Sequence, residues 1–196
     1  EEADALAAEE KRISMEELVE KYRDRFDGEG NGEFVWPSSA FMAQFLSCCP
    51  SFVKEKVVLE VGCGVGVVGV AASLAGAQEV LLTDKDPTVF GMARRNAEEN
   101  SVSDRVAFAE VDWTDEGTWP QPMRQCDVIV GADVLFNMAC MQGLVKFLDG
   151  SMAETGRALI CDPRQRMMRP AFVALCEDAG FEVSTMLDTP DMVMLN

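Results

Sequence analysis

Three glycines at alternate positions, directly after a short apolar run, form the most informative segment of this chain. The run covers residues 57–61 and contains one charged residue, Glu60. The glycines are Gly62, Gly64 and Gly66, and small apolar residues follow over 67–75. The pattern predicts a buried strand, a tight turn and the N-terminus of a helix. Such a turn allows a ligand to approach the backbone closely, and the helix N-terminus attracts a carboxylate or phosphate.

Acidic residues stand at the ends of three further expected strands. They are Asp84, Asp112 and Asp133, and Trp113 follows the second of them. In an open parallel sheet, ligands bind beyond the carboxyl ends of the strands. Asp84 could accept hydrogen bonds from both hydroxyls of a ribose there, and Asp112 could accept one from an exocyclic amine. Trp113 could cover a purine ring, and Glu60 could meet a positive charge.

Apolar runs that alternate with helical patterns must position these residues. The expected strands cover residues 57–61, 79–83, 106–111, 127–130, 157–161, 181–187 and 192–195. The expected helices cover residues 38–46, with Ser38 or Ser39 as the N-cap, and 67–75, 87–100, 138–149 and 170–179. The alternation predicts an α/β fold, a Rossmann-like, doubly wound sheet of seven strands, mostly parallel, with helices on both faces. The last two strands are joined by about four residues, too few for a crossover helix, so they must form an antiparallel C-terminal hairpin.

The segment before these elements has a different composition. Residues 3–27 are rich in Ala, Glu, Leu and Arg, which predicts one or two amphipathic helices, and a glycine-rich loop follows. We therefore divide the chain into an N-terminal helical extension with its loop, residues 1–33, and a domain over residues 34–196. Neither a signal-peptide layout nor an apolar run of about 18 residues is present, so we expect a cytoplasmic protein, with the nucleus as an alternative.

Composition disfavours several kinds of chemistry. The chain has no histidine, and its seven cysteines form no C-x-x-C pair, so we expect free thiols in a reducing compartment and no metal site. The formal net charge of −17 disfavours a nucleic-acid partner, whereas a basic protein or a small cation would be attracted. A basic cluster follows the fifth expected strand, and we interpret it as a solvated loop rather than a carboxylate clamp. It consists of Arg164, Arg166 and Arg169.

Two cofactors compete for the glycine turn. Residues 64–69 form G-x-G-x-x-G, the dinucleotide fingerprint, but the turn begins two residues earlier, at Gly62. The only tyrosine is Tyr22, so a nicotinamide enzyme would lack both a Y-x-x-x-K pair and a histidine as its acid–base group. The run E-x-G-x-G-x-G that starts at Glu60, with acidic residues after the next two strands, resembles the class I, seven-strand methyltransferases, which bind S-adenosyl-L-methionine.

A narrower resemblance rests on four segments, residues 35–39, 59–64, 112–113 and 131–136. Together they resemble methyltransferase family 16, whose members are mostly protein-lysine methyltransferases. The family pattern after the fourth strand is D-x-x-Y, and here Asp133 and Phe136 make it D-x-x-F.

The resemblance implies a role for each matching residue. The residues that line the cofactor would be Trp36, Glu60, Gly62, Cys63, Gly64, Gly66, Asp84, Lys85, Asp112, Trp113 and Ala132. The product would be S-adenosyl-L-homocysteine. The catalytic residues would be Asp133, which faces the accepting amine, and Phe136, which with Trp36 could attract an ammonium by cation–π contact.

The implied activity is N-methylation of a protein lysine by a monomeric enzyme, with a basic or lysine-bearing protein as substrate and neither a nucleic acid nor a membrane as partner. Two alternatives stay open. A small-molecule amine methyltransferase should have a closed pocket with the N-terminal helices as a lid. A non-catalytic module that binds the cofactor or a partner is suggested by Phe136.

Overall fold

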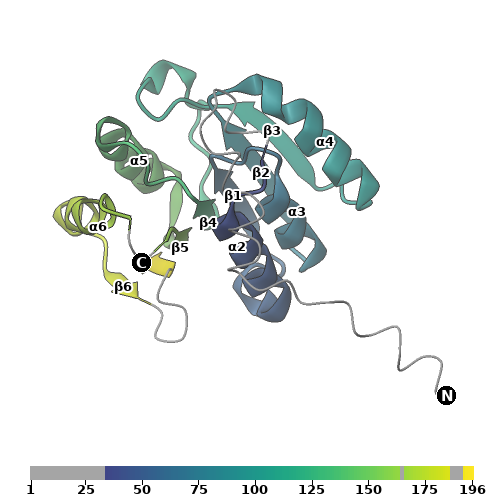
Figure 1. The fold of residues 1–196 in the computed structure, drawn as a ribbon, viewed down its shortest axis with the longest axis horizontal. Helices are drawn as coiled ribbons and strands as arrows, with labels where there is room; N and C mark the ends of the chain where they lie inside the picture. The colour runs from purple at the N-terminus through teal and green to yellow at the C-terminus, as the bar shows by residue number, and fades with distance from the viewer. Residues whose placement is uncertain (1–33, 164–165, 186–191) are drawn as a thin grey trace. The chain divides into compact units, whose positions relative to one another are not determined.

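Five parallel strands, β1 to β5, form most of a seven-stranded sheet (Figure 1). The computed structural model describes residues 34–163, 166–185 and 192–196, so the helices expected within residues 3–27 lie outside the described part. The strands are β1 (Val57–Val61), β2 (Glu79–Asp84), β3 (Val106–Glu110), β4 (Cys126–Ala132), β5 (Met152–Cys161), β6 (Val183–Thr185) and β7 (Met192–Leu195).

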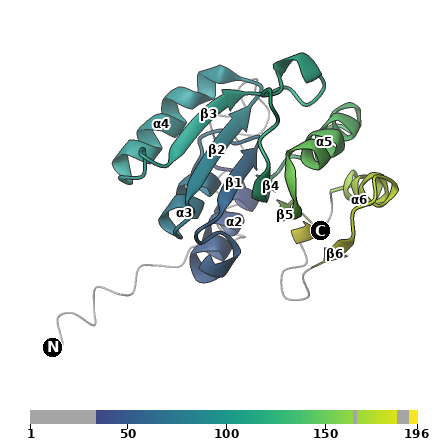
Figure 2. The same cartoon turned by 180° about the vertical axis from the view of Figure 1, so that it is seen from behind.

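The strand order confirms the doubly wound sheet. It runs β3-β2-β1-β4-β5-β7-β6, and Figure 2 shows the sheet from behind. The chain builds outward from β1 to β3 and then returns to the other side of β1 with β4, so the order reverses between β1 and β4. That switch point is where an open α/β sheet binds its ligands. The antiparallel hairpin is also confirmed, because β7 pairs antiparallel with both β5 and β6.

Helices cover both faces of the sheet. They are α2 (Pro37–Cys48), α3 (Val67–Leu74), α4 (Phe90–Glu99), α5 (Met138–Ser151) and α6 (Arg169–Asp178). Alternate residues of each strand enter different cores, as the two-residue period of a strand requires. Val58 packs in the core beneath α2, α3 and α4, whereas Leu59 packs with α5 and α6. Glu60 therefore points toward the α3 face, although it is a charged residue in a central strand.

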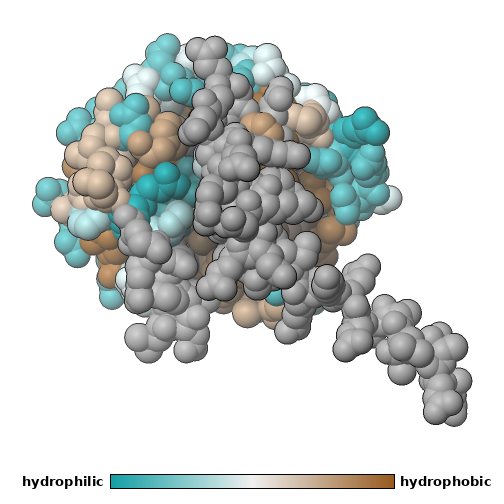
Figure 3. Space-filling model, viewed as in Figure 1, coloured by the Kyte–Doolittle hydropathy of each residue, from teal (hydrophilic) through white to brown (hydrophobic). Residues whose placement is uncertain are grey.

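Helix α4 is amphipathic, with one face buried against the sheet. Its buried residues Phe90, Ala93 and Ala97 recur at helical spacing. Arg94 and Glu98, which directly follow Ala93 and Ala97, are exposed, and Figure 3 shows hydrophilic side chains gathered in this part of the surface.

The structure corrects several expected boundaries. Strand β4 continues to Ala132, and β5 begins at Met152, five residues before the expected start at residue 157. Pro87 begins a short 3₁₀ turn, η4 (Pro87–Val89), that precedes α4, because the Asp86 carboxylate accepts a hydrogen bond from the amide of Thr88 at 3.0 Å. Residues 186–187, expected to end the sixth strand, lie outside the described residues.

Two further observations bear on the expectations from composition. Cys63, Cys126 and Cys176 are buried free thiols. Within the part of the chain that the structure describes, no helix is both long enough and apolar enough to cross a membrane.

Candidate cofactor and acceptor site

The glycine turn, residues 62–66, carries β1 into α3 with an unusual backbone. Gly62, Gly64 and Gly66 all have positive φ, at 64°, 49° and 77°. Residues other than glycine are strained at positive φ. A Cβ added at Gly62 would lie 3.0 Å from Val134 Cγ1 and 3.5 Å from the ring of Trp113. Glycine therefore lets the turn pack closely against the segments that follow β3 and β4.

Glu60 lies beneath this turn. Its side chain is almost fully buried, and Oε2 accepts a hydrogen bond of 2.7 Å from the amide of Gly69, in the first turn of α3. Burial raises the pKa of Glu60 to about 8, the Gly69 amide lowers it, and the nearby charge of Asp84 raises it further. A Cβ on Gly69 would stand 2.7 Å from Oε2, so glycine is needed there for the carboxyl group to reach the helix. Glu60 is therefore a buried acid, and a positive charge placed beside it would favour its ionised form.

Asp84 holds the glycine turn from the side. Its Oδ2 accepts a hydrogen bond from the amide of Gly64 at 2.9 Å, and its Oδ1 accepts one from the amide of Asp86 at 3.1 Å. Asn96 of α4 donates from Nδ2 to the carbonyl of Val65 at 2.8 Å. The structure thus brings the predicted residues Asp84 and Gly64 together. Asn96 was missed, because a lone amide inside an amphipathic helix gives no sequence signal.

Asp112 and Trp113 follow β3 and lie on the same edge. Asp112 Oδ1 accepts hydrogen bonds from the amide and the hydroxyl of Thr114, at 2.8 and 2.6 Å. These bonds hold the pKa of Asp112 below its ordinary value, and the exposed Lys85 lowers it further. Asp112 is therefore an ionised acceptor at neutral pH. The indole Nε1 of Trp113 is buried without a hydrogen-bond partner among the described residues, although its ring reaches Gly62.

Asp133 has a different environment from the one expected of a residue that faces an amine. Its side chain is only 4% exposed. Oδ2 accepts a hydrogen bond from the amide of Ser38 at 3.0 Å, and Oδ1 is 2.5 Å from Nη2 of Arg166. Its backbone is left-handed, with φ of 57°. The expectation that a serine side chain caps α2 is wrong, since Trp36 is the N-cap. Its side chain does not cap the helix, and the Asp133 carboxylate accepts the hydrogen bond from the Ser38 amide instead.

A second acid, Asp162, completes this corner. It is 1% exposed, and its two oxygens accept hydrogen bonds from the successive amides of Val134 and Leu135, at 3.2 and 3.3 Å. Arg166 Nε lies 3.1 Å from Asp162 Oδ1. Burial raises the pKa of Asp162 to about 7, the charge of Asp133 adds to the rise, and Arg166 opposes it. Asp162 follows the fifth strand directly, so its place in the sequence was a signal that the prediction did not use.

The basic cluster after β5 also needs correction. Arg166 clamps two carboxylates and is not a solvated side chain. The terminal nitrogens of Arg169 are buried as well, and Arg164 lies outside the described residues.

The turn after β4, residues 132–136, carries the remaining predicted residues and is called the acceptor turn below. Ala132 is buried at the strand end, whereas the side chain of Phe136 is 54% exposed. Met138, at the start of α5, is 50% exposed. Trp36 lies next to this turn in the structure, because Ser38 binds Asp133 and the Trp36 carbonyl accepts hydrogen bonds from the first amides of α2. The segments around residues 36 and 133 therefore belong to one site.

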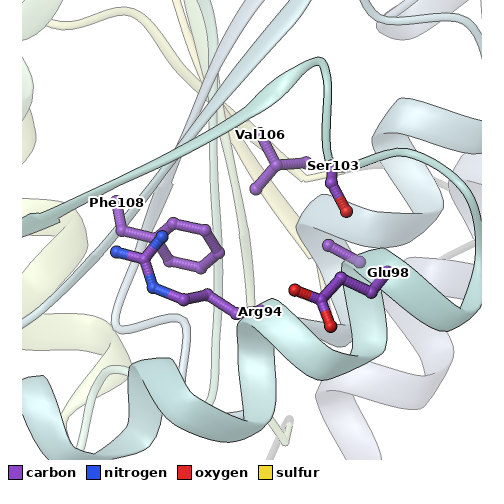
Figure 4. Close-up of a pocket in the computed structure, with 6 residues that line it drawn as sticks. Arg94, Glu98, Ser103, Val106 and Phe108 are labelled. Carbon is purple, nitrogen blue, oxygen red and sulfur yellow. The ribbon is translucent and has the colours of Figure 1, made fainter.

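A small cavity lies elsewhere, between α4 and β3 (Figure 4). Arg94 stands over the ring of Phe108, with its guanidinium carbon 4.2 Å from the ring centroid, and Glu98 and Ser103 line the other side. The volume is about 80 Å³. Small-molecule sites usually have at least about 300 Å³, so we do not assign a ligand to this cavity.

Comparison with known proteins decides the family. Residues 22–179 match the family described as "Lysine methyltransferase". This chain belongs to the lysine methyltransferase family. It is 30% identical over 162 residues to protein-lysine N-methyltransferase EFM3 of Chaetomium thermophilum, a match covering 76% of this chain and 48% of that protein. It is 41% identical over 108 residues to ribosomal protein L11 methyltransferase of Acinetobacter baumannii, covering 53% of this chain and 35% of the relative.

Solved structures agree on the fold. The ribosomal protein L11 methylase of Lactobacillus delbrueckii superposes with a TM-score of 0.65 and 21% identity, covering 83% of this chain and 78% of that one. Such a low identity shows the fold alone. The matches of this member of the lysine methyltransferase family cover 48% of the first curated relative named above and 35% of the second.

Proposed function

We propose that this chain transfers a methyl group from S-adenosyl-L-methionine to the side-chain amine of a lysine in a protein. The observation that carries the proposal is the left-handed glycine turn, bonded to Glu60 through α3 and to Asp84 directly, in a member of the lysine methyltransferase family. Both relatives named above are called methyltransferases of a protein, which supports a protein acceptor.

The residues present fit this cofactor. Helix α3 begins at Val67, and its N-cap Gly66 provides no capping side chain. Glu60 already binds the amide of Gly69, so the amides of Val67 and Val68 are the ones that the positive end of the helix can offer to the carboxylate of the methionine part. Glu60 beneath the turn suits the ammonium group, and Asp84 and Asp112 are acceptors for ribose hydroxyls and the adenine amine. Trp113, Gly62, Cys63 and Lys85 complete the lining that the family resemblance implies. When bound, S-adenosyl-L-methionine supplies a methyl group that its sulfonium has already activated.

The chain's residues then have to orient the amine, and the acceptor turn is suited to this. In-line transfer needs the nitrogen within about 3 Å of the methyl carbon, and positioning of this kind can supply most of the rate enhancement. Phe136 and Met138 expose apolar surface on which the alkyl chain of a lysine can lie. The net charge of −17 attracts a basic segment. We assign to Asp133 the shaping of the turn that receives the amine, because Arg166 and the Ser38 amide already bind its two oxygens, and to water the proton that the amine loses before transfer.

Labelling tests the proposal directly. The purified chain would be incubated with methyl-tritiated S-adenosyl-L-methionine and a panel of basic proteins that includes ribosomal protein L11, and the protein hydrolysed to amino acids. We expect label in methyllysine, lost in Asp84→Ala and retained in Asp104→Ala, an exposed acid outside the site. Label in a small amine would favour the small-molecule alternative.

Calorimetry with S-adenosylhomocysteine, beside a nicotinamide dinucleotide as control, tests the cofactor separately. Binding of the first without label in any acceptor would favour the non-catalytic module. Binding of neither would refute the assignment of the glycine turn. The monomeric state and the cytoplasmic location stay predictions from the sequence.

A further inference from the structure

One guanidinium joins two buried carboxylates at the acceptor turn. Arg166 Nη2 lies 2.5 Å from Asp133 Oδ1, and Arg166 Nε lies 3.1 Å from Asp162 Oδ1. The side chains of Asp133 and Asp162 are 4% and 1% exposed, and that of Arg166 is 24% exposed. The guanidinium donates a hydrogen bond to Asp133, whereas its contact with Asp162 is a close ion pair, because Nε has no hydrogen-bond partner among the described residues.

Each carboxylate holds a different part of the backbone. Asp162 binds the amides of Val134 and Leu135, inside the acceptor turn. Asp133 binds the amide of Ser38, at the start of α2. The guanidinium therefore connects the acceptor turn, the segment after β5 and the N-terminus of α2. The left-handed backbone of Asp133 is a conformation that must be held by its surroundings.

We propose that Arg166 is a positioning residue of the acceptor site, which fixes the conformation of residues 132–136 by pairing with Asp133 and Asp162 together. The inference rests on the proposed function for the meaning of the acceptor turn. It makes Asp133 a residue that acts through this network, because an amine can reach its nearly covered oxygens only by displacing Arg166 or the Ser38 amide.

Burial separates this cluster from an ordinary surface ion pair. Arg95 and Glu99 on α4 form such a pair, at 2.9 Å, with side chains 77% and 60% exposed. Exposed pairs of this kind contribute little to stability, whereas removal of one partner from a buried cluster leaves an uncompensated charge. Without Arg166, two buried carboxylates would face each other. The charged groups with a resolved effect on Asp162 are Asp133 and Arg166, which act in opposite directions on its pKa.

Carboxyl ¹³C NMR of the whole chain tests the cluster without any acceptor. We expect Asp162 to titrate near neutral pH in the wild type, at clearly higher pH in Arg166→Met, and at an unchanged pH in Arg95→Met. Asp162→Asn identifies the signal by removing it. Arg166→Lys should restore part of the shift, since an ammonium can approach one carboxylate but cannot span both in the same geometry. An unchanged midpoint in Arg166→Met would overturn the proposal.

Activity then separates positioning from folding. With the acceptor found by labelling, Arg166→Met should lower kcat by about tenfold or more, whereas its Kd for S-adenosylhomocysteine should stay within about twofold of the wild type. Equal loss of cofactor affinity would show a general structural defect and overturn the positioning role. If no acceptor is found, the proposed function fails, and the NMR midpoint still decides whether the guanidinium controls the two acids.

Discussion

Binding of the cofactor product should release a proton, because Glu60 is protonated in the free protein. A carboxyl group with a pKa of about 8 is about one-tenth ionised at pH 7. An ammonium group placed beside Glu60 favours the carboxylate, so its pKa falls on binding. The reaction at pH 7 should then release about 0.9 proton per ligand, and the release should decrease as the pH rises through about 8.

Isothermal titration of the chain with S-adenosylhomocysteine measures this number. The binding enthalpy is recorded at one pH in buffers of different ionisation enthalpy, and the slope gives the protons released. Below about pH 7 the affinity should rise nearly tenfold for each pH unit, and above about pH 8 this rise should end.

Two variants sharpen the assay. Glu60→Gln keeps the shape and an acceptor for the Gly69 amide but cannot ionise, so the release at pH 7 should disappear. Glu110→Gln, an exposed acid at the end of β3, should behave as the wild type. A wild-type protein that releases no proton at pH 7 would refute the reasoning, as would a release of the same size in Glu60→Gln.

Three further predictions follow from packing and charge. Gly69→Ala should destabilise the fold by about 1–3 kcal/mol in chemical denaturation, because its Cβ would stand 2.2 Å from Leu82 Cδ2. The control Gly91→Ala meets nothing within 4 Å and should be neutral or slightly stabilising. Equal stability of the two variants would contradict the packing argument. Phe136→Ala should raise KM for the protein acceptor with kcat nearly unchanged. Leu74→Ala, which removes another exposed apolar side chain, should change neither constant. A decrease in kcat alone would contradict a role of Phe136 in binding the acceptor. Because the pKa of Asp162 is raised, its stabilising contribution is fully present below the ordinary pKa of 3.8 and is lost as the pH rises through about 7. The melting temperature of the wild type should therefore fall over this range relative to Asp162→Asn. Parallel melting curves against pH would show that the pKa of Asp162 is not raised in the folded protein.

The fold could be predicted from the sequence because its signals are local. An apolar run such as β1, a glycine turn and a small-residue helix define one unit, and the alternation of such units leaves one sheet architecture. The end of β4 was harder to predict, because Gly131 is a weak strand former. Its pairing with β5 extends the strand to Ala132.

The site was predictable only where its residues follow strand ends in sequence. Asp84 and Gly64 are joined by a hydrogen bond, as their shared edge of the sheet implies. The sequence gives no sign that Asp133 binds the amide of Ser38, because the two residues are 95 positions apart and the contact depends on tertiary packing. Arg166 was misread for the same reason, since a basic residue in a loop is usually solvated and only the neighbouring acids make it a buried partner.

The hydrogen bond between Asp133 and Ser38 also has a consequence for how the chain folds. The units β1–α3–β2 and β2–α4–β3 form from contacts that are close in sequence, and the glycine turn lies wholly inside them. The acceptor turn, in contrast, needs residues near positions 38, 133 and 162 at once. Bringing such distant segments together lowers the entropy of the chain before any stabilising contact has formed. The half of the site that binds the cofactor should therefore form early during folding, and the half that receives the amine should form last.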